Sequence, residues 1–205
     1  MLVDHVTYVS PDAARMAAEL RERHGLGTER NGYLPHIGCR SWSVPLTPPS
    51  YLEILEAENR DAAAATPLGR SILDLADVGG GLIAWCVVSE DVDEVAARVG
   101  VTPYDGLTEG VYGTLRWRTV TGPEHLPFFI TYDDDGARAG RLAARYDRVA
   151  HDSAPTQFSR IDVGGGPAEY DAWLGPHDLP LRFVEGPPGL RAVAIATTRG
   201  EVEIA

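Results

Sequence analysis

Two ionisable side chains, His5 and Glu53, lie in apolar runs of the sequence, where polar groups can mark a pocket. His5 lies in the apolar run "LVDHVTYV", and Glu53 lies in the later run "YLEILEAE". Both runs indicate partly buried strands, where an ionised carboxylate is costly unless a donor or cation compensates it. We therefore treat both residues as site candidates. The alternatives are that His5 is a hydrogen-bonded histidine paired with Asp4, and that Glu53 forms an ion pair with Arg40.

A second group of candidates lies in "PHIGCRSW". On a strand, His36, Gly38, Arg40 and Trp42 would point to one face. The guanidinium fork of Arg40 suits a carboxylate or phosphate of a ligand, and Gly38 would leave room for a ligand against the backbone. The alternative is a surface cation–π pair between Arg40 and Trp42. Trp85, from a later apolar run, joins His36, Arg40 and Trp42 as a predicted substrate-binding residue.

The net charge of −12 excludes some partners. A nucleic-acid-binding protein needs a basic face, and an anionic lipid surface would repel this chain, so we expect neither partner. No apolar run approaches the length of a membrane span, and the N-terminus shows no secretion signal. Only Cys39 and Cys86 are present, without a CxxC motif, which favours reduced thiols and a cytoplasmic location.

Several kinds of chemistry are excluded by missing residues or motifs. The 18 basic residues are all arginine, so neither a lysine Schiff base nor a P-loop lysine exists. No GxGxxG sequence follows a predicted strand, and no GxSxG elbow is present. We therefore expect no nucleotide cofactor.

The elements that must position the candidates repeat along the chain. A strand over 2–9 precedes a helix that begins at Ser10-Pro11-Asp12, where a hydroxyl, a proline and an acid are typical of a helix start. Strands over 28–33, 36–46 and 51–56 complete a βαβββ unit. The pattern recurs from Leu82, with a helix over 91–99, and again from Gln157, and such internal repeats decide the fold prediction.

The predicted fold class is α+β, with repeated βαβββ modules that form curved mixed sheets around a cleft. One such unit cannot cover its own sheet, so it must pair with another unit. The predicted organisation is a first module over 1–60, a helical connection over 61–80, a second module over 81–133, a helical linker over 134–156 and a shorter third module over 157–205.

The sequence resembles the glyoxalase-like domains of the vicinal oxygen chelate superfamily. The resemblance covers nearly the whole chain and is carried by "DHVTYVSPDAARMAAEL", "PHIGCRSWSVPL", "YLEILEAE", "GLIAWCVVSEDVDEVAARV" and "LPFFITY". It implies paired βαβββ modules. In metal-using members it also implies metal ligands from the first and last strands of each module, with substrate oxygens chelating the metal.

Carried over by position, the resemblance makes His5 and Glu53 the metal ligands of the first module. The second module has Ala84 and Phe129 at those positions, and neither can hold a metal. The third module has Ile161 and Glu203, so the predicted metal site is His5, Glu53 and Glu203. Such a donor set suits a divalent ion of undetermined identity that acts as a Lewis acid, with Glu53 as the catalytic carboxylate.

Two functions remain open. The first is a metal-assisted isomerase, lyase or ring-cleaving oxygenase that acts on a small oxygen-rich molecule, which His5 and Glu53 favour. The second is a metal-independent binding protein that sequesters a small molecule, as in drug resistance, which Ala84 and Phe129 favour. A third alternative is a degenerate copy that only scaffolds. The resemblance also makes a homodimer an expectation.

Overall fold

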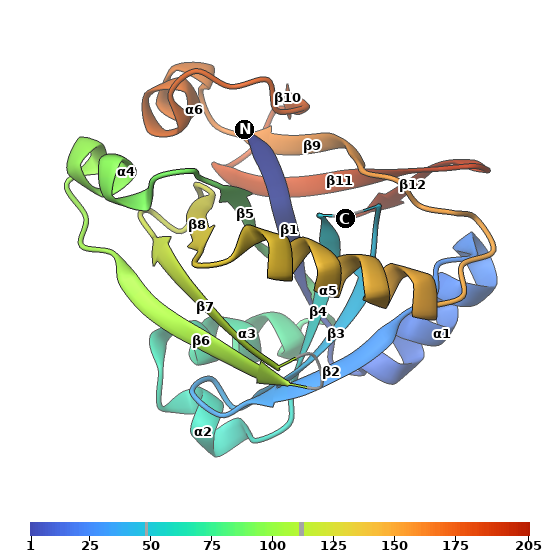
Figure 1. The fold of residues 1–205 in the computed structure, drawn as a ribbon. Coiled ribbons are helices and arrows are strands. Elements are labelled where there is room, and N and C mark those ends of the chain that lie inside the picture. The colour runs from blue at the N-terminus through green and yellow to red at the C-terminus, as the bar shows by residue number, and fades with distance from the viewer. Residues whose placement is uncertain (48, 111–112) are drawn as a thin grey trace.

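The fold places two βαβββ modules side by side in one curved sheet (Figure 1). The computed structural model describes residues 1–47, 49–110 and 113–205. The first module consists of β1 (Leu2–Val9), α1 (Ala13–His24), β2 (Glu29–Leu34), β3 (Cys39–Pro45) and β4 (Tyr51–Ala57). The second consists of β5 (Gly81–Val88), α4 (Val92–Val99), β6 (Tyr104–Gly110), β7 (Gly113–Val120) and β8 (Phe128–Tyr132).

The sheet of the two modules has eight strands in the order β2-β3-β4-β1-β5-β8-β7-β6. Within each module the first strand pairs in parallel with the last, β1 with β4 and β5 with β8. The modules join where β1 pairs antiparallel with β5. The predicted fold class of repeated modules in curved mixed sheets is therefore confirmed.

Helices lie between the two modules and after the second one. The connection between the modules carries α2 (Arg60–Ala64) and α3 (Pro67–Asp77), and the linker after the second module carries α5 (Asp135–Arg148). The side chain of Thr66 accepts a hydrogen bond from the Gly69 amide, with Pro67 in the first turn, which is the helix start that Thr66-Pro67 favours.

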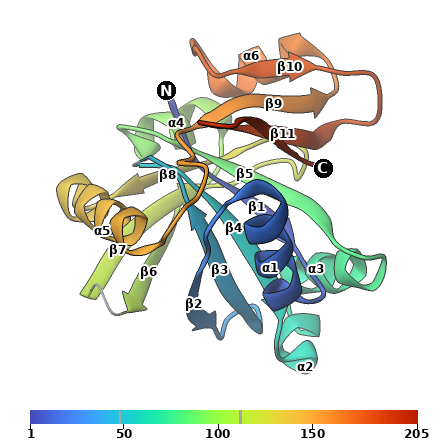
Figure 2. The same ribbon diagram turned by 90° about the vertical axis from the view of Figure 1, so that its right-hand side faces the viewer.

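The last part of the chain forms a separate sheet of four strands (Figure 2). It contains β9 (Phe158–Gly164), α6 (Pro167–Leu174), β10 (Leu181–Phe183), β11 (Gly189–Thr197) and β12 (Gly200–Ile204). The element order is that of a βαβββ module, but the strand order is β10-β9-β11-β12. Its first strand pairs in parallel with its second, not with its last. The predicted third repeat thus shares an element order with the modules and not their pairing.

The eight-stranded sheet has two different faces, because side chains alternate along a strand. We call one the core face: Val6, Ile54 and Trp85 lie there in the main hydrophobic cluster, together with α1 and with the four-stranded sheet through Ile161 and Val193. We call the other the site face. On it α3 packs against Leu55, while α5 crosses in front of β1, β4 and β3 (Figure 1).

Candidate active site

His5 and Glu53 lie on the site face of neighbouring strands. In the parallel pair of β1 and β4, His5 is opposite Tyr51 and Thr7 is opposite Glu53. Because side chains alternate with a period of two residues, all four share one face of the sheet. The Thr7 hydroxyl donates a hydrogen bond of 3.4 Å to Glu53 Oε2. The structure therefore brings together two residues that are far apart in the sequence.

Glu53 is held by a set of short polar side chains on the neighbouring strands. The Ser41 hydroxyl of β3 donates to Glu53 Oε1 at 2.8 Å, and Asn31 of β2 donates to Ser41 at 3.1 Å. These donors compensate the carboxylate charge without a cation, and the side chain stays half-buried. Glu53 therefore remains able to accept a further hydrogen bond from a ligand.

The Glu53 charge acts on the ionisable groups around it. Burial, with Glu53 as a smaller contribution, raises the pKa of the Cys39 thiol to about 11. The same two causes hold the pKa of the Tyr51 phenol and of the Cys86 thiol well above their ordinary values. These three groups therefore stay protonated near neutral pH.

His5 is oriented by Asp4, its neighbour in the chain. The pairing of β1 with β5 shifts between Val3 and His5, which makes Asp4 the extra residue of a β-bulge. Asp4 and His5 can therefore meet, and His5 Nδ1 lies 2.6 Å from Asp4 Oδ2. The imidazole stacks on the Tyr51 ring with centroids 4.9 Å apart, and it meets the Phe128 ring edge-on at 5.4 Å. Desolvation lowers the pKa of His5, against a smaller opposing effect of Glu53.

The charge of Asp4 is neutralised by an arginine of α5. Its carboxylate is fully buried and forms an ion pair with the Arg138 guanidinium. The Tyr132 hydroxyl donates to Asp4 Oδ2 at 3.0 Å, and the guanidinium lies over the Tyr132 ring, 4.6 Å from its centroid. Arg138 also donates to the Pro49 carbonyl at 2.9 Å. Burial lowers the pKa of Arg138 to about 10, so it remains a cation at neutral pH.

One group of residues in the described part of the chain has the spacing of a metal site. Donor atoms of Asp4, His5 and Cys86 all lie within 4.8 Å of one another. The Arg138 cation already neutralises Asp4, and it would repel a dication held by the same carboxylate. Cys86 would also have to lose its proton to bind a metal, and burial raises the pKa of its thiol. This group therefore fits a divalent ion poorly.

The residues predicted from "PHIGCRSW" do not line the site face. His36 and Gly38 lie in a turn before β3 begins, with His36 exposed and Gly38 buried, so the expectation of one shared strand face is wrong for them. Arg40 is opposite Glu56 and Trp42 is opposite Ile54, which places both on the core side of the sheet. The guanidinium of Arg40 forms a two-pronged ion pair with Glu58. The alternative of an Arg40–Glu53 ion pair is likewise wrong, since hydroxyls hold Glu53.

Trp85 and Glu203 also lie away from His5. Trp85 is 1% exposed and is opposite Val6 in the core. Glu203 lies in β12 of the four-stranded sheet, where its exposed carboxylate pairs with Arg160. The second module contributes Phe128 to the site, while Phe129 is buried in the core.

The space that Gly38 was expected to leave for a ligand is filled by the chain itself. A Cβ atom there would lie 2.4 Å from the carbonyl oxygen of Asn59 and 2.6 Å from the amide nitrogen of Ala63. The Gly38 carbonyl accepts from the Glu58 and Asn59 amides. Gly38 therefore allows the close approach of α2 and leaves no space for a ligand.

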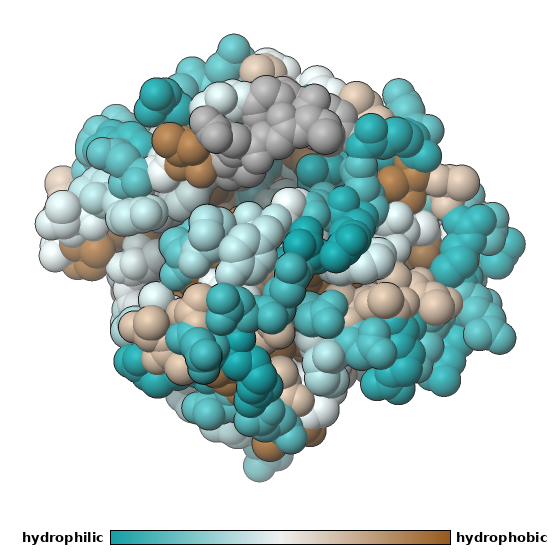
Figure 3. All heavy atoms as spheres, turned by 90° about the horizontal axis from the view of Figure 1, so that it is seen from below, coloured by the Kyte–Doolittle hydropathy of each residue, from teal (hydrophilic) through white to brown (hydrophobic). Residues whose placement is uncertain are grey.

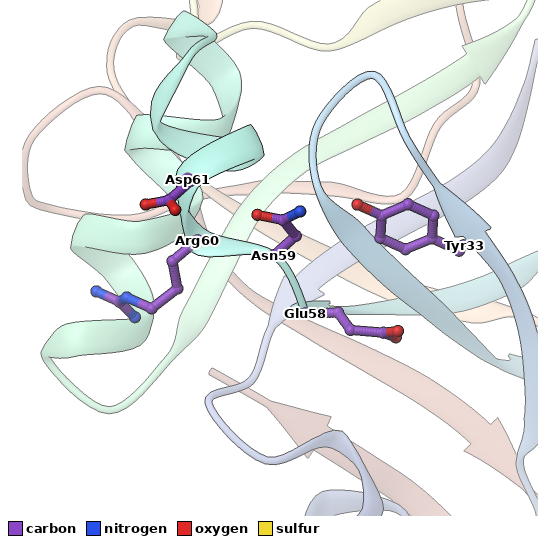
Figure 4. Close-up of a pocket in the computed structure, with 5 residues that line it drawn as sticks. All are labelled: Tyr33, Glu58, Asn59, Arg60 and Asp61. Atoms are coloured by element: carbon purple, nitrogen blue, oxygen red, sulfur yellow. The ribbon is translucent and has the colours of Figure 1, made fainter.

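A pocket of about 490 Å³ opens at the outer surface near this turn. Tyr33 and residues 58–61 line it, and the Tyr33 hydroxyl points across the opening toward Asn59 (Figure 4). It contains neither His5 nor Glu53. Seen from below, the molecule exposes mostly hydrophilic residues with small separate hydrophobic patches (Figure 3).

Comparison with known proteins identifies the family. Residues 3–176 match the model of the glyoxalase-like domain family, and these residues make up most of the chain. The chain therefore belongs to the glyoxalase-like domain family. The match ends just after α6, so β10, β11 and β12 lie beyond it. No curated protein matches the sequence.

Solved structures with some likeness include two methylmalonyl-CoA epimerases. The Streptomyces coelicolor enzyme, in a variant bound to 2-nitronate-propionyl-CoA, is 20% identical over 64% of this chain and 96% of its own, with a TM-score of 0.47. The Mycobacterium tuberculosis enzyme is 15% identical over 69% of this chain and 91% of its own, with a TM-score of 0.48. A hypothetical protein of Bacillus halodurans is 14% identical over 65% and 94%, with a TM-score of 0.47. At these values the likenesses assign no ligand or reaction to this chain.

The helices of the described residues are too short or too polar to cross a membrane.

Proposed function

We propose that this protein binds a small oxygen-rich molecule on the site face, between His5 and Glu53, and that binding needs no metal ion. The observation that supports this most is the placement of an imidazole and a half-buried carboxylate on neighbouring strands. The rings of Tyr51 and Phe128 flank His5 and suit the apolar side of such a ligand. Ligand sites commonly combine aromatic walls with a few placed polar groups.

A matched pair of variants tests the proposal. Thermal stabilisation by a panel of small diols, hydroxy ketones and phenols should identify binders of the wild-type protein. Glu53→Gln should lose that stabilisation, because an amide cannot replace the charged acceptor. Glu203→Gln is the control, since Glu203 lies on the outer sheet, and it should keep the stabilisation. Equal stabilisation of both variants would reject Glu53 as a ligand contact.

A metal-assisted isomerase, lyase or oxygenase is the second candidate. It is favoured by the proximity of donor atoms of Asp4, His5 and Cys86. The guanidinium of Arg138 opposes it, because a cation already occupies the carboxylate of Asp4. Elemental analysis of protein dialysed against Zn²⁺ or Mn²⁺ decides between the two. Near-stoichiometric metal that His5→Gln abolishes would favour the enzyme, and ligand binding that persists in chelator would favour the metal-independent protein.

A cytoplasmic location and a homodimeric state stay predictions from sequence. Gel filtration with light scattering would test the second.

A further inference from the structure

The strongest unexplained feature of the site face is a buried chain of polar contacts that runs from α5 to His5. Arg138 pairs with Asp4, and Asp4 contacts His5. We propose that Arg138 and Asp4 are positioning residues that hold His5 as a neutral imidazole with its proton on Nδ1. His5 Nε2 is then left as an acceptor for an O–H or N–H group of the ligand. This inference rests on the proposed function, since it describes how the ligand site is prepared.

The position of the proton follows from the chemistry of the contacts. An ionised carboxylate only accepts hydrogen bonds, so the 2.6 Å contact with Asp4 requires the proton to lie on His5 Nδ1. Arg138 keeps Asp4 ionised, since a buried carboxylate without a cation would take up a proton. The Tyr132 hydroxyl donates to the same Asp4 oxygen at 3.0 Å and fixes the carboxylate further.

The neutral state follows from the charge balance. Arg138 and Asp4 form a buried ion pair whose two charges cancel. This ion pair therefore has no net charge that would stabilise a protonated His5. The other groups that face His5 are the Tyr51 and Phe128 rings, the Cys86 thiol and the Glu53 carboxylate. Burial lowers the pKa of His5, and the charge of Glu53 opposes this by a smaller amount.

The second imidazole nitrogen is available to a ligand. His5 Nε2 has no hydrogen-bond partner among the described residues, and the His5 side chain is 9% exposed. Glu53, on the neighbouring strand of the same face, is also an acceptor. Two acceptors on neighbouring strands of one face select a ligand with two donors, such as a diol or an amino alcohol, over a carboxylate, which Glu53 would repel.

The test measures the protonation of His5 directly in the folded 205-residue chain. Long-range proton–nitrogen correlation spectra of protein labelled with nitrogen-15 histidine distinguish the nitrogen that carries a proton from the one that does not. His5→Gln assigns the His5 signal by its loss. His151 is an internal reference of opposite type, because its Nδ1 accepts from the Gly27 amide at 3.1 Å. At neutral pH, His5 should carry its proton on Nδ1, and a proton on Nε2 or on both nitrogens would overturn the proposal.

Variants then separate the two positioning residues. Asp4→Asn should move the proton to Nε2, since an amide can turn its NH₂ toward Nδ1. Arg138→Gln should raise the pKa of His5, because an unpaired Asp4 carboxylate would then bind an imidazolium, while Arg138→Lys should restore the neutral ring. Glu203→Gln, on the four-stranded sheet away from His5, is the control and should keep the proton on Nδ1. An unchanged His5 in both Asp4→Asn and Arg138→Gln would overturn the assignment.

The two proposals can fail separately. If the His5 proton behaves as described but no diol, hydroxy ketone or phenol binds, the proposed function fails and the positioning role stands. If Glu53-dependent ligand binding is found with the His5 proton on Nε2, the positioning role fails and the proposed function stands.

Discussion

Arg138 of α5 and Asp4 of β1 form an ion pair that is almost closed to solvent, with side chains 6% and 0% exposed. Removing one partner would leave the other charge buried and unpaired, which is costly. We expect Arg138→Met to lower the free energy of unfolding by about 3–5 kcal/mol. Urea denaturation measures this.

The matched control keeps the shape of the site and removes both charges. Asp4→Asn combined with Arg138→Met should recover much of the loss, because no charge is then left unpaired. A double variant as unstable as Arg138→Met alone would show that packing of α5, not charge, accounts for the effect.

Gly38 provides a second stability test. Its φ of +65° lies in the left-handed region, and a Cβ there would meet the backbone of Asn59 at 2.4 Å. Gly38→Ala should therefore lower the free energy of unfolding by roughly 1–3 kcal/mol or more. Gly32→Ala is the control, since a Cβ at Gly32 meets nothing within 4 Å. Similar melting temperatures for the two variants would contradict the close approach of α2.

Arg40 should be dispensable for ligand binding. The sequence predicted that it holds an anionic group of the ligand, whereas the structure places it on the core side in a surface pair with Glu58. We expect Arg40→Ala to keep the ligand-induced thermal shift and to change the melting temperature little, because exposed ion pairs contribute little. If Arg40→Ala loses the ligand-induced thermal shift while Glu53→Gln keeps it, this assignment is wrong.

The burial of a neutral His5 predicts a pH dependence of stability. In the folded protein the pKa of His5 is below its ordinary value near 6.5. As the pH falls below about 6.5, the unfolded chain binds a proton that the folded chain does not, so the free energy of unfolding decreases. Urea midpoints measured above and below this pH should fall less in His5→Gln than in the wild type. An equal fall of the urea midpoint in the wild type and in His5→Gln would exclude His5 as a source of the pH dependence.

The fold class and the strands that carry His5 and Glu53 could be predicted from sequence, since alternation along a strand is a local property. It indicated strands around His5 and Glu53, and the repeat indicated that modules pair. Which modules pair, and that two of them share one sheet, was not predicted. β6, over Tyr104–Gly110, gives no strand signal of its own in the sequence, because its glycines and acids lack an apolar alternation. It forms through its antiparallel partner β7.

The rest of the site depends on contacts that no local pattern encodes. The pairing of Asp4 with His5 was foreseen only as an alternative. Arg138 is one of 18 arginines, and nothing in its helix distinguishes it. Its role follows from the path of α5 over the sheet. Likewise, the error at His36 came from extending a strand through a turn that ends only at Cys39.

The helix that carries Arg138 is also the tether between the second module and the outer four-stranded sheet. A change in the length of that tether would rotate or shift the guanidinium relative to Asp4, even if every residue of the binding face were kept. Relatives that dock their terminal strands differently are therefore expected to differ in how their histidine is charged. Grafting His5 and Glu53 onto another such scaffold would transfer the two side chains without the electrostatics that prepare them.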